Sequence, residues 1–121
     1  MKARILVVDD EKNQGLLYEQ ELTDEGYEVD VANSGEDAIE MVRKKPFDLV
    51  ILDIGMPDID GLETLGRMLS MDNKLPVILN TAYPSYKDNF MSWAADAYVI
   101  KSSNLTELKE KIRESLNRKN G

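Results

Sequence analysis

The stretch Leu49-Val50-Ile51-Leu52-Asp53 decides how this chain folds. Four consecutive apolar residues are followed at once by a carboxylate. An unbroken apolar run of this length is typical of a β-strand covered on both faces, as in a parallel sheet between layers of helices. A carboxylate at the rim of such a core is costly to bury without a partner. We therefore expect a parallel sheet with a functional aspartate at the end of one strand.

Four more strands are predicted around this one. They cover residues 4–8, 28–32, 76–80 and 97–100. The run Glu28-Val29-Asp30-Val31 alternates between acidic and apolar residues, which suits a strand at the edge of a sheet.

Helices are expected between and after the strands, five in all. Four helix starts carry a polar residue with an acidic residue three positions later, the pattern of a capping box. These pairs are Ser34 with Asp37, Asp60 with Glu63, Ser85 with Asp88, and Asn104 with Glu107. Gly26 stands where a left-handed residue would end the first helix.

Alternation of strands and helices with short connections predicts an α/β fold with a parallel sheet and right-handed crossovers. A closed eight-fold barrel needs about twice this length. We expect a three-layer, doubly wound, five-stranded sheet of the flavodoxin-like type, with strand order 2-1-3-4-5. We expect the 121 residues to form one domain, residues 1–121.

Composition narrows the chemistry. The net charge of −8 argues against sequence-independent binding of nucleic acid, which needs basic residues. The chain has no cysteine and no histidine, so any bound metal must have oxygen ligands, which favours Mg²⁺, Ca²⁺ or Mn²⁺. The longest apolar run is far short of a membrane span, and we expect a cytoplasmic location.

Five polar residues follow or end the predicted strands: Asp9, Asp10, Asp53, Thr81 and Lys101. Each has an ordinary interpretation by itself, such as a turn, a helix cap, a strand threonine or a solvated lysine. In a parallel sheet, however, the carboxyl ends of the strands meet at one edge, where ligands bind. Three carboxylates, a hydroxyl and an ammonium there suit Mg²⁺ and a phosphoryl group held on an aspartate.

The sequence resembles the receiver domain of two-component response regulators over essentially its whole length. The residues that carry the resemblance are Val7-Val8-Asp9-Asp10-Glu11, Asp48 to Asp53 with Met56-Pro57 and Asp60-Gly61, Pro76 to Ala82, and Ala95 to Lys101. The middle segment is the most specific of these.

The resemblance implies a role for each matching residue. Asp53 would be the phosphoacceptor; Asp9, Asp10, Asp53 and the Gly55 carbonyl would hold Mg²⁺; Thr81 and Lys101 would bind phosphoryl oxygens; and Tyr98 would turn inward as Thr81 moves. The donor would be the phosphohistidine of a sensor histidine kinase or histidine phosphotransfer protein, and a downstream protein or output domain would read the switch. We expect no turnover enzyme, and no nucleic-acid or membrane binding by this domain.

Some alternatives stay open. The chain is read as a stand-alone regulator, the alternative being a receiver domain from a larger response regulator or hybrid kinase. A phosphatase of the haloacid dehalogenase type would need an aspartate at Gly55, and a flavodoxin-like carrier would not place Asp9-Asp10-Glu11 beside a cofactor phosphate. A receiver that is never phosphorylated is a third rival. Ser102 replaces the proline usual in the family, so the turn after the last strand is expected to be built differently.

Overall fold

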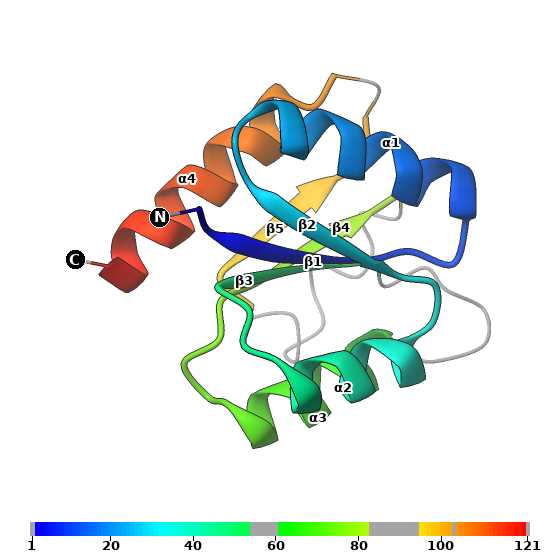
Figure 1. Cartoon of the computed structure of the whole chain (residues 1–121), viewed down its shortest axis with the longest axis vertical. Helices are drawn as coiled ribbons and strands as arrows, with labels where there is room; N and C mark the ends of the chain where they lie inside the picture. Colours follow the sequence, from blue (N-terminus) through cyan, green and yellow to red (C-terminus); the bar gives the residue numbers. More distant parts are fainter. Residues whose placement is uncertain (1, 54–60, 83–94, 103, 121) are drawn as a thin grey trace.

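The computed structural model describes residues 2–53, 61–82, 95–102 and 104–120, and shows a central sheet between two layers of helices (Figure 1). The strands are β1 (Arg4–Val8), β2 (Glu28–Ala32), β3 (Leu49–Leu52), β4 (Val77–Thr81) and β5 (Ala97–Ile100). The helices within the described ranges are α1 (Lys12–Asp24), α2 (Gly35–Lys44), α3 (Gly61–Met71) and α4 (Thr106–Asn120).

The sheet is parallel, with the order β2-β1-β3-β4-β5. The predicted fold class and strand order are therefore confirmed. The fifth helix, expected to start near Ser85, falls outside the described residues. None of the helices in the described ranges combines the length and the apolar character needed to cross a bilayer.

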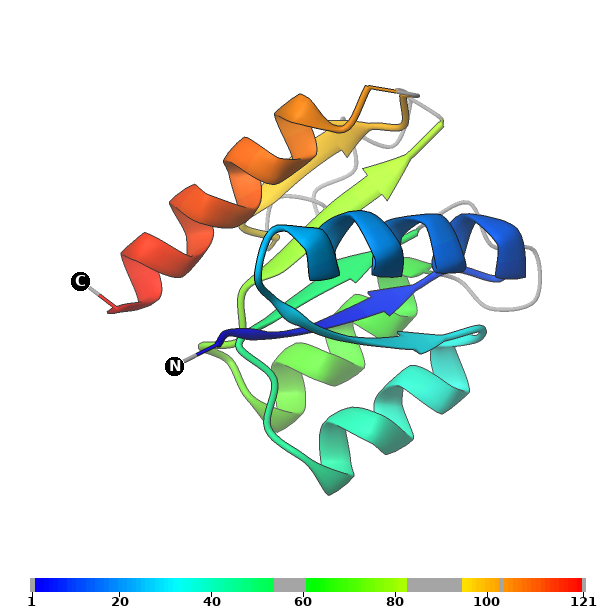
Figure 2. The same ribbon diagram turned by 45° about the horizontal axis from the view of Figure 1, so that its top comes forward.

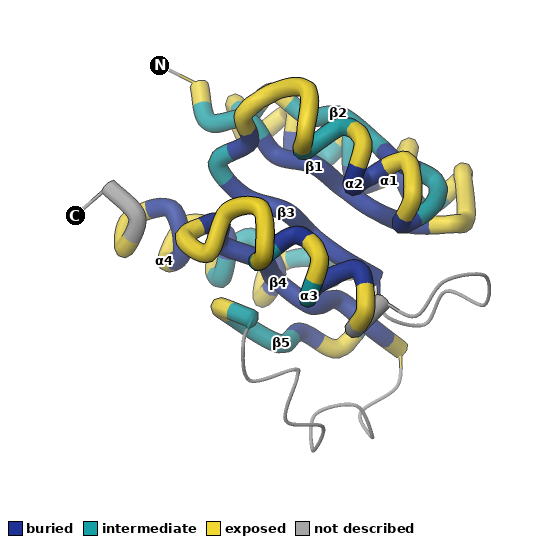
Figure 3. Tube along the Cα trace, turned by 90° about the horizontal axis from the view of Figure 1, so that it is seen from below, coloured by how far each residue is buried: buried dark blue, intermediate teal, exposed yellow. Residues whose placement is uncertain are grey.

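Two helices cover each face of the sheet. Figures 1 and 2 show α1 and α4 on one side and α2 and α3 on the other. Alternate residues of a strand point to opposite faces, so each strand supplies both cores. One core contains Leu6, Val8, Val50, Leu52, Val77 and Leu79 under α2 and α3, and the other contains Ile5, Val7, Leu49, Ile51, Ile78 and Val99 under α1 and α4. Figure 3 shows the central strands β1, β3 and β4 as buried, while the helices carry many exposed residues.

Two helix boundaries form as the sequence predicts. The Ser34 hydroxyl accepts a hydrogen bond from the backbone N–H of Asp37 at 3.1 Å and caps α2. At the end of α1, Gly26 has a φ of +98°, and the N–H groups of Gly26 and Tyr27 donate back to Thr23 and Leu22. This pattern is a Schellman motif, in which glycine avoids the cost of a left-handed residue with a Cβ.

Strand β4 begins one residue later than predicted and ends one residue later. Pro76 has no N–H to donate to a sheet ladder, although its carbonyl oxygen accepts from Val50 at 2.9 Å. At the other end, Thr81 pairs with Ile100 and accepts a hydrogen bond from the backbone N–H of Lys101. Thr81 therefore lies inside β4, and its backbone oxygen is hydrogen-bonded directly to Lys101, the residue that follows β5.

Helix α1 lies close against the sheet at Gly15. A Cβ placed on Gly15 would lie 2.8 Å from Cγ1 of Val31 on β2, a distance that real Cβ atoms do not tolerate. The absence of a side chain at Gly15 therefore sets how near the first turns of α1 approach the strand ends.

We expect Gly15→Ala to lower the free energy of unfolding by about 1 kcal/mol. Overpacking costs roughly 1–3 kcal/mol, and the better helix propensity of alanine returns about 1 kcal/mol. Urea unfolding of Gly15→Ala, Val31→Ala and the double variant gives the coupling between the two positions. The double variant should lose less than the sum of the single losses, and strict additivity would contradict the close contact.

Candidate functional site

The carboxyl ends of β1 and β3 bring two aspartates side by side. The backbone ladder continues one residue beyond the paired strands, since the N–H of Asp9 donates to Ala32 and the N–H of Asp53 donates to Val8. Both side chains are buried, with 1% of Asp9 and 6% of Asp53 exposed. The strand register alone therefore fixes these carboxylates next to each other at the edge of the core.

Asp10 completes an acidic cluster with them. Asp9, Asp10 and Asp53 each offer one carboxylate oxygen, and these oxygens all lie within 4.8 Å of one another. Asp10 is exposed, so the cluster opens to solvent on that side. Three oxygen donors at this spacing fit a hard divalent cation, which takes a few carboxylates and keeps waters in its shell.

Lys101 reaches this cluster from the end of β5, the strand at one edge of the sheet. Its ammonium lies 3.1 Å from Oδ2 of Asp9 and 3.0 Å from Oδ2 of Asp53. When ionised, the three carboxylates and the ammonium together carry two net negative charges, which a divalent cation balances. The sequence predicts this convergence of Asp9, Asp10, Asp53 and Lys101, and the structure places the four side chains together.

Burial and the neighbouring groups shift two pKa values at the site. Burial raises the pKa of the Asp9 carboxyl, against the opposing effects of the Glu11 backbone N–H and of Lys101. For Lys101, burial alone would lower the pKa, but hydrogen bonds and attraction from Asp53 and Asp9 outweigh it and raise the pKa. The Lys101 ammonium therefore stays charged at neutral pH, while Asp9 binds a proton more readily than an exposed aspartate does.

Thr81 lies on β4 and Tyr98 on β5, the two strands between the acidic cluster and the edge of the sheet. Thr81 is fully buried at the end of β4. Tyr98 is half-buried on β5, opposite Leu79, and packs against the core under α2 and α3. Leu79 and Thr81 are two residues apart and so share a face of the sheet, which puts Thr81 and Tyr98 on the same face. Gly55, the expected backbone ligand, lies outside the described residues.

The carboxylates and Lys101 line a small open cavity. Its volume is about 220 Å³, which suits a hydrated ion or a phosphoryl group more than a large cofactor. The lining residues are Asp9, Asp10, Glu11, Gln14, Asp53, Ala82 and Lys101. Gln14 is the member that the sequence did not single out. It lies in the first turn of α1, and no pattern in the sequence singled it out.

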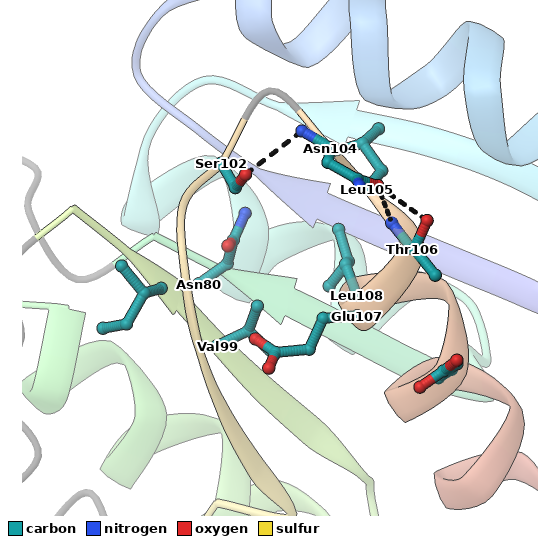
Figure 4. Close-up of a pocket in the computed structure, with 10 residues that line it drawn as sticks. Asn80, Val99, Ser102, Asn104, Leu105, Thr106, Glu107 and Leu108 are labelled. Atoms are coloured by element: carbon teal, nitrogen blue, oxygen red, sulfur yellow. Dashed lines mark hydrogen bonds between the residues drawn. The ribbon is translucent and has the colours of Figure 1, made fainter.

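The turn after β5 is built from side-chain hydrogen bonds (Figure 4). The Ser102 hydroxyl accepts from the backbone N–H of Asn104 at 3.1 Å, and the side-chain Oδ1 of Asn104 accepts from the N–H and the hydroxyl of Thr106. Asn104 therefore bonds to Thr106, rather than to Glu107 as a capping box would require. Proline lacks a hydroxyl and cannot make the Ser102 contact, so this turn is held in a way that the usual family residue does not allow.

We expect Asp10→Ala to raise the free energy of unfolding by about 1 kcal/mol in metal-free buffer. Two like charges at this distance repel by roughly 1 kcal/mol in water and more near a protein surface, and Asp10 faces solvent. Denaturant unfolding with and without Mg²⁺ measures the effect, and Mg²⁺ should stabilise the wild type more than the variant. Asp24→Ala, an exposed aspartate on α1, is the control for the general loss of one negative charge. A loss of stability in Asp10→Ala alone would contradict the repulsion.

The fold and the site together define a class: a small doubly wound domain with an acidic cluster and a lysine at the carboxyl edge of its sheet. The family model of the response regulator receiver domain matches residues 5–113. The chain belongs to this family of response regulator receiver domains.

Similar proteins agree with this assignment. The response regulator ArlR of Staphylococcus epidermidis is 38% identical over 116 residues, covering 94% of this chain. The transcriptional regulatory protein PcoR of Escherichia coli is 35% identical over 117 residues, covering 95% of this chain. The chain spans about half the length of these relatives, 52% of each.

Among solved structures, the response regulator TrrA of Thermotoga maritima, in complex with Mg²⁺ and BeF, is 50% identical with a TM-score of 0.91. The two chains are covered to 95% and 99% respectively. A structure of the histidine kinase ThkA in complex with TrrA also matches, at 51% identity and a TM-score of 0.89, covering 96% of this chain and 99% of that one.

Proposed function

We propose that this receiver domain accepts a phosphoryl group on Asp53 and passes the signal on by a change in conformation. One observation carries the proposal. The buried Asp53 carboxylate lies 3.0 Å from the Lys101 ammonium, and one of its oxygens lies within 4.8 Å of carboxylate oxygens of Asp9 and Asp10. An ionised aspartate is a competent nucleophile and needs no general base. The lack of histidine in the chain is therefore no obstacle.

The transfer is a single displacement at phosphorus. A carboxylate oxygen of Asp53 attacks the phosphorus of a phosphohistidine donor, the new P–O bond forms, and the P–N bond breaks with its electron pair left on the imidazole nitrogen. Lys101 holds Asp53 before the transfer and donates to phosphoryl oxygens after it, joined by the Thr81 hydroxyl. The protein mainly positions and neutralises charge, as loose transition states of this kind require.

Mg²⁺ belongs to the same proposal. Asp9, Asp10 and Asp53, with the backbone carbonyl of Gly55, would hold it, and when bound it supplies positive charge toward the phosphoryl oxygens. The oxygen-only donor set and the two net negative charges at the site support this choice. The complex of the similar Thermotoga regulator with Mg²⁺ and BeF supports it too.

The donor would be a sensor histidine kinase or a histidine phosphotransfer protein. The complex of TrrA with the kinase ThkA supports a kinase as partner. The switch would run through Thr81 and Tyr98, which share a face of the sheet beside the site. A downstream protein or an attached output domain would read it, and this domain would contact neither nucleic acid nor membrane. A single covalent event, rather than turnover, is the expected activity.

The test is intact-protein mass spectrometry after incubation with Mg²⁺ and a small acyl-phosphate donor. The wild-type protein should gain the mass of one phosphoryl group. Many turnovers of a generic phosphate ester without a lasting adduct would favour a phosphatase, and no adduct under any condition would favour a receiver that is never phosphorylated.

A further inference from the structure

Gln14 makes the shortest of three side-chain hydrogen bonds to the Lys101 ammonium. Its Oε1 atom accepts from Nζ of Lys101 at 2.8 Å, compared with 3.1 Å for Asp9 and 3.0 Å for Asp53. An ammonium has three N–H donors, and these three acceptors match all of them. They come from three elements, the ends of β1 and β3 and the first turn of α1, so Lys101 is held from three directions.

Lys101 needs such anchors because of where it starts. It follows β5, at one edge of the sheet, and its ammonium reaches past β4 to the ends of β3 and β1. A lysine side chain is long and flexible, and holding it in one place costs roughly 2 kcal/mol of rotamer entropy. Only 16% of this side chain is exposed, so water supplies little of its hydrogen bonding.

The three acceptors differ in what phosphorylation would do to them. Asp53 would become an acyl phosphate, and Asp9 would be shared with a bound cation. Gln14 is neutral and takes no part in the acidic cluster. Because the ammonium only donates hydrogen bonds, the amide must turn its oxygen toward Lys101, and this contact can persist while the other two change.

The backbone of α1 places Gln14 next to the cavity that contains Lys101. The neighbouring residue Gly15 has no side chain, so α1 packs close to Val31 on β2, and the Gly15 N–H donates to the Glu11 backbone oxygen at the start of the helix. Gln14 also lines the same cavity as Asp53 and Lys101, so it faces the space where the phosphoryl group would bind.

We propose that Gln14 is a positioning residue, which holds the Lys101 ammonium over the phosphoryl site while Asp53 changes from a free carboxylate to an acyl phosphate. A neutral amide suits this role because it orients the lysine without adding a fourth negative charge to a cluster that must admit a phosphoryl donor. The inference rests on the proposed function of Asp53.

The test compares the wild type with Gln14→Leu, Gln14→Glu and Gln20→Leu. Leucine keeps the approximate size at position 14 and removes the acceptor, and glutamate restores an acceptor oxygen at the same reach. Gln20 is exposed on the same helix and is the matched control. Thermal unfolding checks that all four proteins fold equally well.

Two readouts follow. We expect Gln14→Leu to be phosphorylated by a small acyl phosphate about tenfold more slowly than the wild type and Gln20→Leu, the range expected for a lost hydrogen bond to a charged group. With Mg²⁺ and beryllofluoride bound, the side-chain NH₃⁺ signal of Lys101 in the NMR spectrum, assigned by its absence in Lys101→Met, should be present in the wild type and in Gln14→Glu. It should be lost through exchange with water in Gln14→Leu.

The outcomes are distinguishable. A wild-type phosphorylation rate and an unchanged Lys101 signal in Gln14→Leu would overturn the role of Gln14 and leave the proposed function intact. Equal loss of the signal in Gln14→Leu and Gln14→Glu would also overturn it, because packing at position 14 would then be the cause. A wild-type protein without an adduct on Asp53 would remove both proposals together.

Discussion

Asp53→Ala should take up no phosphoryl group from a small acyl-phosphate donor, under conditions in which the wild type gains one. The variant lacks the carboxylate oxygen that would form the bond to phosphorus. Asp9 should not replace it, because Asp9 is buried and held by Lys101 and by the backbone N–H of Glu11. The effect should therefore be complete loss of the adduct, measured as the mass of the intact protein.

Two variants separate chemistry from folding in this experiment. Asp53→Asn keeps the shape of the side chain and should also remain unmodified. Asp24→Ala removes an exposed aspartate on α1 and should be modified at the wild-type rate. An adduct of normal size on Asp53→Ala would show that another residue accepts the phosphoryl group.

The sheet could be predicted because its strands are marked by short apolar runs in the sequence. Runs such as Leu49-Val50-Ile51-Leu52 have apolar side chains on both faces, and the order of strands and helices permits few parallel arrangements. The meeting of Asp9 with Asp53 follows from the register in which Val8 pairs with Leu52. These parts of the site depend on the backbone and on the strand order, and the strand order can be predicted from the sequence pattern.

The contacts of Lys101 could not be predicted in the same way. The sequence predicts that Asp9, Asp10, Asp53 and Lys101 meet at one edge of the sheet, but not which carboxylates Lys101 contacts. The structure shows Lys101 between Asp9 and Asp53, so the protein neutralises part of the cluster itself. Which carboxylates a flexible lysine selects depends on side-chain packing across β4, and no periodicity in the sequence encodes this.

Gln14 and Ser102 show the same limit. The position of Gln14 over the site depends on how closely α1 approaches β2 at Gly15 and Val31, a distance between elements far apart in the sequence. Ser102 was visible as a departure from the family, but the hydrogen bond that it accepts from Asn104 depends on the path of the turn. Such contacts need coordinates, because many sequences with the same pattern would place these side chains differently.

Lys101→Met should lower the free energy of unfolding by about 3 kcal/mol at neutral pH without metal. Methionine keeps most of the length of the side chain but leaves Asp9 and Asp53, which are 1% and 6% exposed, without the ammonium between them. Removing one partner of a buried ion pair typically costs roughly 3–5 kcal/mol, and we take the lower end because Asp9 can bind a proton. Denaturant unfolding in the presence of a chelator measures the loss.

Mg²⁺ should return part of this stability, because a cation bound only by the folded state stabilises it by mass action and replaces the missing positive charge. Lys109→Met is the matched control: its ammonium lies 3.5 Å from Glu21, and these side chains are 23% and 42% exposed. A partly exposed pair of this kind contributes roughly 0–1 kcal/mol, so the control should unfold near the wild-type midpoint without responding to Mg²⁺ beyond the wild-type response. If Lys101→Met proved as stable as Lys109→Met in the chelator, the two aspartates would have to be neutral or solvated in the folded protein, and the charge balance on which the phosphoryl site depends would be lost.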